Sequence, residues 1–505
     1  MRLLRAGFTL SREGAFSLIP TQGLPASAKF AISILRLVER RSVKKTGRVE
    51  RLTKALNKLG PTYVKFGQIL ATRPDIVGIE IAKDLSLLQD RMDPFDEKLV
   101  PKILERELEG KEKEILDLSP AIAAASIAQV HKAKLIDKNG NEEIIAVKIL
   151  RPNIREQFKK DIKSYYAGAR LLEKIVPIMK RLNPVKVIKI LDHSATLELD
   201  LRFEAASISE FEENIKNDEG FTLPEVKWDY IAQDVLVTSF IDAIPIRDSK
   251  AIDKAGIDRK KLGTHLMQSF LRHAIRDGFF HADMHPGNLF ADAKTHGIIA
   301  VDFGIMGRIK KQERKFLANI IYGFITRDYH RIAQMHIDIG YVPKSQSVDD
   351  FALALRSIGE PIQGQLSSEI SMGKLLGQLL AITEIFDMQT RPELVLLQKT
   401  MVLVEGVALS LDPKLNFWEV SKPVVEKWIK EQAGPKGKIE EAKEGFEILL
   451  KTAKQIPELV ERANNVLNEH EKLLAKQNNG SGWLKKGAII MMFLIGLGLI
   501  YKLFS

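Results

Sequence analysis

The stretch "HADMHPGNLFADAKTHGIIAVDFG", residues 281–304, decides the fold class expected for this chain. Asp283 and Asn288 lie five residues apart with a glycine turn between them, and Asp302 ends an apolar strand 19 residues after Asp283. An aspartate at a strand end suits a Mg²⁺ ligand, and the asparagine suits a second metal contact. Asp283 can accept a proton from a nucleophile or orient it. The pattern therefore predicts phosphate chemistry.

A lysine further upstream extends this pattern. Lys148 closes the apolar run "IIAVK", residues 144–148, after a predicted hairpin at Asn139-Gly140. From such a strand a lysine would reach the α- and β-phosphates of a nucleotide. Each element alone is a weak signal, because a lysine at a strand end is more often a solvated edge residue. Their order and spacing together are specific.

Two histidines near Asp283 suggest a second kind of metal site. His281 and His285 flank this aspartate, four residues apart. Zinc sites need three or four ligands, and the sequence offers no second histidine cluster. The better interpretation is that His281 braces the loop through a side-chain hydrogen bond, while Pro286 fixes the backbone.

The composition is that of a globular protein with an excess of basic residues. The chain has 505 residues, which exceeds the size of a single core, so two or more substructures are expected. The net charge is +11, with a basic block between Arg36 and Lys54. Such a block can bind an anionic membrane or nucleic acid, or form a solvated helix face. It lacks interleaved aromatic residues, which argues against nucleic acid. The absence of cysteine excludes disulfides and thiolate chemistry.

The C-terminal end predicts a membrane anchor. Residues 487–501 are uncharged and almost wholly apolar, and a helix over residues 484–502 approaches the thickness of the hydrocarbon core. Trp483 and Tyr501 are placed as interfacial anchors. A pair of lysines at the start of this span predicts that the folded part of the chain stays on the cytoplasmic side.

A second informative stretch is "KLGPTYVKFGQILATRPDI", residues 58–76, which predicts a helix beginning at Pro61. Lys65 and Gln68 are neighbours one turn apart on this helix. No acidic residue lies between Lys65 and Asp75, so Lys65 either finds a carboxylate at a distance or is a solvated surface lysine. The apolar residues around Lys65 favour the distant carboxylate.

Taken together, these motifs resemble those of the UbiB family of atypical protein-kinase-like proteins. The matching segments cover most of residues 1–310. They are "KFGQ" at 65–68, "AIAAASIAQVH" at 121–131, "AVK" at 146–148, "ELDLRFEA" at 198–205, "HADMHPGN" at 281–288 and "VDFG" at 301–304. As a set, these motifs are highly specific.

The resemblance implies a role for each matching residue. Lys148 would bind nucleotide phosphates, Asp283 would be the base of the catalytic loop, and Asn288 with Asp302 would hold Mg²⁺. An alanine-rich loop would take the place of a glycine-rich phosphate loop at the nucleotide. That loop comprises Ala123, Ala124, Ala125, Ser126 and Ile127. Because a Cβ atom narrows backbone freedom, this loop should be stiffer than a glycine loop.

The resemblance also implies ion-pair partners for the two lysines. Glu198 and Asp200 match the Glu-x-Asp motif of the family and are the candidate partners of Lys65, whose helix would lie over the nucleotide pocket as part of the catalytic site. Glu204 matches the glutamate that pairs with the strand lysine. From the sequence, either Glu198 or Glu204 can be the residue that meets Lys148.

The implied fold class is α+β: a bilobal protein-kinase-like fold with an N-terminal helical extension and a C-terminal transmembrane helix. The expected parts are the extension with the Lys-x-Gly-Gln motif (residues 1–115), a β-rich N-lobe (116–250), a helical C-lobe with the catalytic and metal loops (251–476), a linker (477–483) and the membrane anchor (484–502).

The chain also departs from related patterns. Ala282 stands where protein kinases carry an arginine, and no Ala-Pro-Glu segment follows Asp302, which argues against activation-loop control and against protein substrates. Ser239 and Ala243 stand where the family leads us to expect an acidic residue and a glycine. The adenine pocket is therefore expected to differ in detail.

The expected function is that of a membrane-anchored kinase or ATPase that uses ATP or ADP with Mg²⁺ and supports ubiquinone biosynthesis. The expected partners are membrane lipid, quinone-precursor lipids and other ubiquinone-biosynthesis proteins, without nucleic acid. The expected location is the bacterial inner membrane with the catalytic part in the cytoplasm, and the arginine-containing N-terminus leaves the mitochondrial inner membrane as an alternative. Two rival functions are a catalytically silent, nucleotide-gated lipid chaperone and a small-molecule kinase resembling aminoglycoside or choline kinases.

Overall fold

The computed structural model describes most of the chain up to residue 435. The described ranges are 2–18, 26–40, 46–71, 92–136, 140–175, 183–363 and 392–435, with a few isolated residues between them. The chain divides into two compact units, Met1–Ile429 and Lys430–Ser505. The expected linker and membrane anchor at 477–502 lie outside the described residues. No helix among the described residues is long and apolar enough to cross a membrane.

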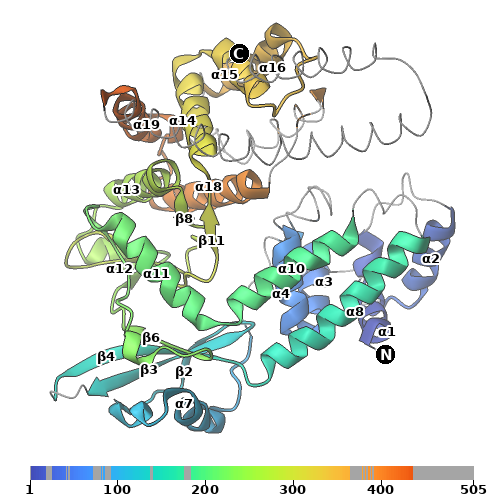
Figure 1. Cartoon of the computed structure of the whole chain (residues 1–505), viewed down its shortest axis with the longest axis vertical. Helices are drawn as coiled ribbons and strands as arrows, with labels where there is room; N and C mark the ends of the chain where they lie inside the picture. The colour runs from blue at the N-terminus through green and yellow to red at the C-terminus, as the bar shows by residue number, and fades with distance from the viewer. Residues whose placement is uncertain are drawn as a thin grey trace, which may run out of the picture. The chain divides into compact units, whose positions relative to one another are not determined.

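The N-lobe is a five-stranded antiparallel sheet with a helix against it. The strand order is β1-β3-β4-β6, and β2 pairs with the first half of β3, which β1 does not reach. The strands are β1 (Ile115–Leu116), β2 (Ala121–Ala124), β3 (Ala128–Ile136), β4 (Glu142–Leu150) and β6 (Val235–Ser239). Helix α7 (Val100–Leu108) covers one face of this sheet (Figure 1). Three short 3-10 turns complete the lobe: η3 (Glu97–Leu99), η4 (Lys111–Glu114) and η5 (Trp228–Tyr230).

The alternation of side chains along β4 decides which way Lys148 points. Ile145, Val147 and Ile149 are fully buried in the apolar core that the sheet shares with α7. Successive side chains on a strand face opposite sides, so Lys148 points to the other face of the sheet. Helix α11 (Leu201–Ile215) contacts β6 of the same sheet and carries the partner of Lys148 described below.

The C-lobe is mainly helical and carries two small sheets. Its helices are α12 (Ser249–Lys254), α13 (Arg259–Arg272) with the π-helical turn η6 (His273–Asp277), α14 (Lys311–Thr326), α15 (Tyr329–Asp338), α16 (Val348–Gln363), α18 (Pro392–Leu411) and α19 (Phe417–Ala433). One sheet has the order β5-β10-β9-β7, from β5 (Phe221–Thr222), β7 (Ile244–Pro245), β9 (Leu289–Ala291) and β10 (Ile298–Ala300). The other pairs β8 (Phe279–His281) with β11 (Met306–Arg308). The decisive stretch 281–304 therefore runs between β8 and β11.

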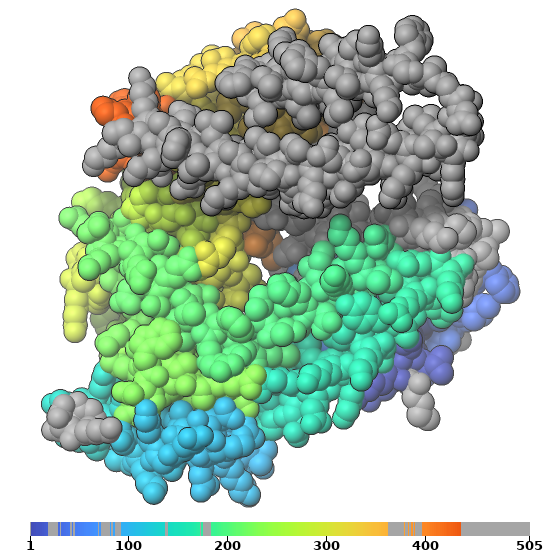
Figure 2. All heavy atoms as spheres, viewed as in Figure 1, coloured from blue at the N-terminus to red at the C-terminus, as the bar shows by residue number. Residues whose placement is uncertain are grey.

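The N-terminal extension is helical and packs on helices that follow the N-lobe hairpin. Its elements are α1 (Arg2–Arg12), η1 (Ala15–Leu18), α2 (Ala26–Leu37), α3 (Arg48–Leu59) and α4 (Pro61–Ala71). Helices α8 (Ile154–Ile175) and α10 (Pro184–Glu198) lie side by side, teal in Figure 2, and contact each other. Helix α4 begins at Pro61 as predicted. Its Tyr63 and Phe66 rings each lie 5.1 Å from the ring of Tyr165 on α8.

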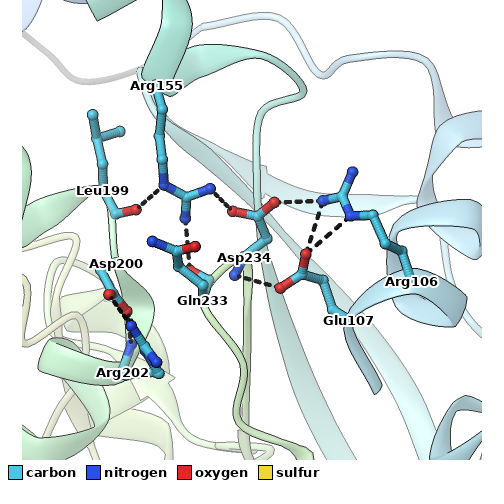
Figure 3. Close-up of polar contacts among 8 residues, drawn as sticks. All are labelled: Arg106, Glu107, Arg155, Leu199, Asp200, Arg202, Gln233 and Asp234. Carbon is cyan, nitrogen blue, oxygen red and sulfur yellow. Dashed lines mark hydrogen bonds and ion pairs between the residues drawn. The ribbon is translucent and has the colours of Figure 1, made fainter. Parts of the chain in front are cut away.

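A polar network ties the junction between α10 and α11 to the N-lobe (Figure 3). Arg155 of α8 donates hydrogen bonds to the carbonyl of Leu199 at 2.8 Å and to that of Gln233 at 3.1 Å, and it forms an ion pair with Asp234. Asp234 also pairs with Arg106 of α7 at 2.5 Å. One arginine therefore holds the α10–α11 junction against the start of β6, and this junction carries two of the predicted site glutamates.

We expect Arg155→Ala to lower the free energy of unfolding by about 2 kcal/mol, because two carbonyl hydrogen bonds and a partly buried ion pair are lost together. Urea unfolding followed by circular dichroism would measure the change. Arg170→Ala, at an exposed position of the same helix, is the matched control and should change stability by less than about 0.5 kcal/mol. Equal effects of the two substitutions would contradict the bracing role of Arg155.

Candidate functional site

Lys148 is the centre of the candidate site. Its ammonium nitrogen lies 2.8 Å and 2.9 Å from the two carboxylate oxygens of Glu204, and 2.9 Å from Oδ1 of Asp302. Lys148 comes from β4, Glu204 from the first turn of α11, and Asp302 from the segment after β10. Three segments that are distant in the sequence thus meet at one cation. The structure answers the open question: Glu204, rather than Glu198, contacts Lys148.

The two carboxylates around Lys148 differ in their electrostatics. Burial by itself would raise the pKa of Asp302, but the charge and hydrogen bond of Lys148 outweigh it and hold that pKa well below its usual range. Burial raises the pKa of Glu204, and Lys148 only partly offsets this. The side chain of Asp302 is 46% exposed, whereas that of Glu204 is 8% exposed. Asp302 is therefore the more accessible of the two carboxylates, and Lys148 holds its pKa low.

The loop after β8 holds Asp283 through His281. The Asp283 backbone N–H donates to Nδ1 of His281 at 3.1 Å, so the neutral ring carries its proton on Nε2, which lies 3.1 Å from the carbonyl oxygen of Val301. Burial lowers the pKa of His281, which keeps the ring neutral. His281 thus braces the loop against the strand that leads to Asp302, as the sequence predicted.

The histidines do not form a metal site in the described part of the chain. His281 uses both ring nitrogens for the contacts just given, and His285 accepts a hydrogen bond from the Gly287 N–H at 2.9 Å. Among the described residues, no group of three or more His, Cys, Asp and Glu side chains is arranged to hold a metal ion.

Asn288 and Asp302 are the residues of the site whose side-chain oxygens suit a Mg²⁺ ion. The amide nitrogen of Asn288 donates to the carbonyl of Asp283 at 3.1 Å, which leaves its side-chain oxygen as the remaining ligand atom. Asp302 adopts the left-handed conformation, with φ of 62°, and a turn follows it. Mg²⁺ commonly takes one or two protein oxygens and completes its shell with waters and phosphate oxygens. Two protein oxygens, one from Asn288 and one from Asp302, are therefore enough for a Mg²⁺ site of this kind.

The alanine-rich segment differs from the expected loop. Ala123 and Ala124 belong to strand β2 and pair with β3, so only Ala125, Ser126 and Ile127 form the turn. The prediction of a loop through all five residues was wrong, because alanine tolerates extended backbone and the hairpin continues through it. The Ala125 N–H donates to the carbonyl of Ala128 at 2.8 Å, which closes the turn.

An arginine that the sequence analysis did not identify holds this turn. Arg151 donates to the carbonyl oxygen of Ala125 from Nε at 3.1 Å and from one terminal nitrogen at 2.9 Å. The same guanidinium reaches the carbonyl oxygen of Asp93 at 2.7 Å. Its position directly before Pro152 carries no motif, so only the folded chain reveals it. The turn is therefore tied down at its tip, which suits the stiffness expected of an alanine loop.

Lys65 of α4 forms an ion pair with Glu198, the last residue of α10. The Lys65 residue is 5% exposed, so the surface-lysine interpretation is wrong. Asp200, the other candidate partner, instead caps α11 and pairs with Arg202, whose nearest nitrogen is 2.6 Å away. The charge of Lys65 also makes a minor contribution to lowering the pKa of Asp302, after the larger effect of Lys148.

Ser239, where the chain leaves the N-lobe sheet, is hydrogen-bonded to Glu225. Ser239 ends β6, and its hydroxyl accepts a hydrogen bond from the Glu225 N–H at 2.9 Å. The Ser239 N–H in turn donates to the carbonyl of Glu225 at 2.8 Å. The residue that replaces the expected acidic side chain is thus used to fix the neighbouring segment.

The site brings together Lys148 on a strand, Glu204 on a helix and Asp302 before a Phe-Gly turn. Asp283 and Asn288 lie on the neighbouring loop. This combination is that of an atypical kinase-like site. The sequence matches the ABC1 atypical kinase-like domain over residues 87–336 and the UbiB helical domain over residues 355–416. The chain belongs to the ABC1/UbiB family of kinase-like proteins, which confirms the resemblance noted from its motifs and the kinase-like α+β fold.

Individual relatives are similar over nearly the whole chain. A Marinobacter nauticus protein named probable protein kinase UbiB is 38% identical over 95% of this chain and 86% of its own length. Proteins of the same name from Vibrio cholerae and Aliivibrio fischeri are 36% and 38% identical, over 88% and 87% of this chain and 84% and 82% of their own lengths.

The pair of Lys65 and Glu198 yields a stability prediction. We expect Lys65→Met to lower the free energy of unfolding by about 3 kcal/mol, because Glu198 is left as a mostly buried charge. Adding Glu198→Gln should restore more than half of that loss, and a double-mutant cycle from urea unfolding measures the coupling.

The matched control is the exposed pair of Lys54 and Glu50, whose side chains are 52% and 53% exposed. Lys54→Met should cost less than about 0.5 kcal/mol. Additive effects at Lys65 and Glu198 would show that the two side chains do not stabilise each other.

Proposed function

We propose that this protein is a Mg²⁺- and nucleotide-dependent enzyme, an ATPase or a kinase for a small or lipid-like acceptor, that supports ubiquinone biosynthesis at a membrane. One observation carries the proposal: Lys148 joins Glu204 and Asp302 beside the loop of Asp283 and Asn288. The motif resemblance to the UbiB family supports the role in ubiquinone biosynthesis.

Each residue has a task in this proposal. Lys148 binds the α- and β-phosphates of ATP or ADP, and Glu204 keeps its ammonium in place. Asn288 and Asp302 hold Mg²⁺, which neutralises phosphate charge when bound. Asp283 orients the acceptor hydroxyl or water and accepts its proton. The turn at Ala125 to Ile127 closes over the nucleotide from the N-lobe side.

The pair of Lys65 and Glu198 supports an acceptor other than a protein. In the proposal, α4 occupies the side of the site where a protein kinase admits a peptide. Acceptors are then lipid-like molecules presented at the membrane, such as quinone precursors. Other proteins of ubiquinone biosynthesis are the proposed macromolecular partners.

Two substitutions separate the enzyme from its rival, a catalytically silent nucleotide switch for lipids. Asp302→Asn should weaken Mg²⁺-dependent ADP binding at least roughly tenfold, because a neutral amide replaces the charged ligand. Asp283→Asn should retain ADP binding while ATP turnover falls about 10³-fold, because only the proton acceptor is lost. Calorimetric titration with Mg²⁺ or with EDTA measures binding, and phosphate release measures turnover.

Asp349→Asn, at an exposed position on α16, is the control and should leave both quantities at the wild-type value. Loss of ADP binding in the Asp283 variant would contradict its assigned role. Full restoration of ubiquinone synthesis by Asp283→Asn in a deficient cell would favour the lipid switch.

Membrane association is the second part of the proposal. The apolar residues 484–502 support an anchor in the bacterial inner membrane. Exposed apolar side chains on the N-terminal helices add support, since Leu4 on α1 is 78% exposed and Phe30 and Leu37 on α2 are 69% and 83% exposed. Basic residues alternate with them in the sequence, as expected of a helix that lies on anionic lipid.

Truncation after Gly482 should leave a folded protein that binds anionic liposomes weakly and is released by about 1 M salt, because the Debye length then falls to about 3 Å. The full-length protein should stay with the liposomes under the same wash. Flotation on a density gradient measures both. Release of the full-length protein by salt would contradict insertion of residues 484–502.

A further inference from the structure

The 92–95 segment, which lies between α4 and α7 in the chain, is hydrogen-bonded to the hairpin that carries the alanine-rich turn. The Met92 N–H donates to the carbonyl oxygen of Ala124 at 3.2 Å, on the β2 side of the turn. The Phe95 N–H donates to the side-chain oxygen of Gln129 at 2.9 Å, on the β3 side. The 92–95 segment therefore contacts both strands of the hairpin next to the turn.

Buried hydrogen bonds fix the contact at Gln129. Gln129 and His131 are both fully buried. Because the side-chain oxygen of Gln129 accepts from the Phe95 N–H, its amide nitrogen donates to Nε2 of His131 at 2.9 Å. Nδ1 of His131 then carries the proton and donates to the carbonyl oxygen of Ser119 at 2.8 Å. Each group in this chain has one defined role, so the 92–95 segment is a firm support for the turn.

Arg151 joins this segment to the turn. Its guanidinium donates to the carbonyl oxygen of Ala125 from two nitrogens, at 3.1 Å and 2.9 Å, and to that of Asp93 at 2.7 Å. Its own backbone N–H donates to the carbonyl oxygen of Ile127 at 2.8 Å. The planar fork of a guanidinium can serve two carbonyl oxygens in fixed directions, which a single ammonium group does less well. Arg151 therefore holds the turn through both its side chain and its backbone.

The contact with Ala125 fixes the orientation of a peptide group in the turn. The C=O and N–H of a trans peptide lie in one plane and point in opposite directions. The peptide between Ala125 and Ser126 therefore cannot turn over without losing two hydrogen bonds from a charged group. A carbonyl oxygen that turned toward a nucleotide would repel its phosphates, whereas oriented N–H groups attract them.

The turn lies at the end of the sheet that carries Lys148. Lys148 on β4 is opposite Val130 on β3, and Leu150 is opposite Ala128, the first residue after the turn. Arg151 follows Leu150 directly. Three positions along an extended chain span about 10 Å, so the anchor of the turn and Lys148 belong to the same end of β4.

We propose that Arg151 is a positioning residue for nucleotide binding, which holds the alanine-rich turn in the conformation that receives the phosphates of ADP or ATP. The inference rests on the proposed nucleotide-dependent function. Arg151 acts through the Ala125 peptide and does not itself contact the nucleotide. A loop that is already held in its binding conformation loses less entropy when the ligand binds, so the hold by Arg151 contributes to affinity.

The first test measures Mg·ADP binding and ATP turnover by the full-length protein. Arg151→Met should raise the Kd of Mg·ADP and the KM for ATP roughly 5- to 10-fold, because the turn must then be ordered on binding. The kcat should stay within about threefold of the wild-type value, because the groups that carry out the reaction remain in place. Arg151→Lys should still bind Mg·ADP at least about threefold more weakly than wild type, because it keeps the charge but loses the fork.

Hydrogen exchange of the nucleotide-free protein tests the hold on the turn directly. Arg151→Met should speed exchange at least roughly tenfold in peptides that cover residues 92–95 and 123–128. Exchange in β4, where it pairs with β6, should stay at the wild-type rate. Arg259→Met is the matched control, at a C-lobe arginine that pairs with Asp253 at 2.8 Å. It should change neither the exchange of the turn nor nucleotide binding.

The outcomes separate this inference from the proposed function. Unchanged Mg·ADP affinity in Arg151→Met, or a fall in kcat at unchanged KM, would overturn the positioning role and leave the nucleotide-dependent function in place. Wild-type affinity in Arg151→Lys would also overturn it, by showing that charge alone is needed. Faster exchange throughout the N-lobe sheet would reduce Arg151 to a general brace. Failure of the wild-type protein to bind Mg·ADP would overturn the proposed function, and the role of Arg151 with it.

Discussion

The sharing of Lys148 between Glu204 and Asp302 is the interaction on which the site depends. It joins the N-lobe sheet, the first turn of α11 and the segment after β10 at a single cation. The position of each group has a separate cause. Alternation along β4 turns Lys148 away from the core that the sheet shares with α7. The Asp200 side chain caps the start of α11, which places Glu204 in the first turn of that helix. His281 ties the Asp283 loop to Val301, the residue before Asp302. Loss of any one of these would separate charges that are costly to leave unpaired.

A second ion pair extends this arrangement to the N-terminal helices. Glu198 and Glu204 lie on either side of the α10–α11 junction, and each takes one lysine, Lys65 from α4 and Lys148 from β4. The junction itself is held by Arg155 through two backbone carbonyls and Asp234. The extension, the N-lobe and the segment of Asp302 are therefore linked through a few residues of one junction.

Much of this arrangement was predictable, since the motifs report local backbone and chemistry. The hairpin before Lys148, the helix beginning at Pro61 and the His281 brace followed from spacing and residue type, and the family followed from the resemblance of the motifs. Two features did not. The alanine segment continues β2, because Ala123 and Ala124 pair with β3. Arg151 carries no motif, and its role arises only where separate elements meet. The membrane anchor at 484–502 stays a prediction.

By itself, the sequence determined the identity and spacing of the lysines and carboxylates, and it favoured a distant partner for Lys65 over solvent, because these depend on residue type and on spacings of a few residues. The resemblance of its motifs indicated the kinase-like class. The tertiary structure decided the pairing. Glu204 pairs with Lys148 and Glu198 pairs with Lys65. Asp200 instead caps α11 and forms an ion pair with Arg202. The physical reason is that three acids within seven residues are equivalent along the chain, whereas the turn between α10 and α11 points them in different directions. Electrostatic attraction falls with distance, so direction and reach, which only the fold supplies, select the partner of each lysine.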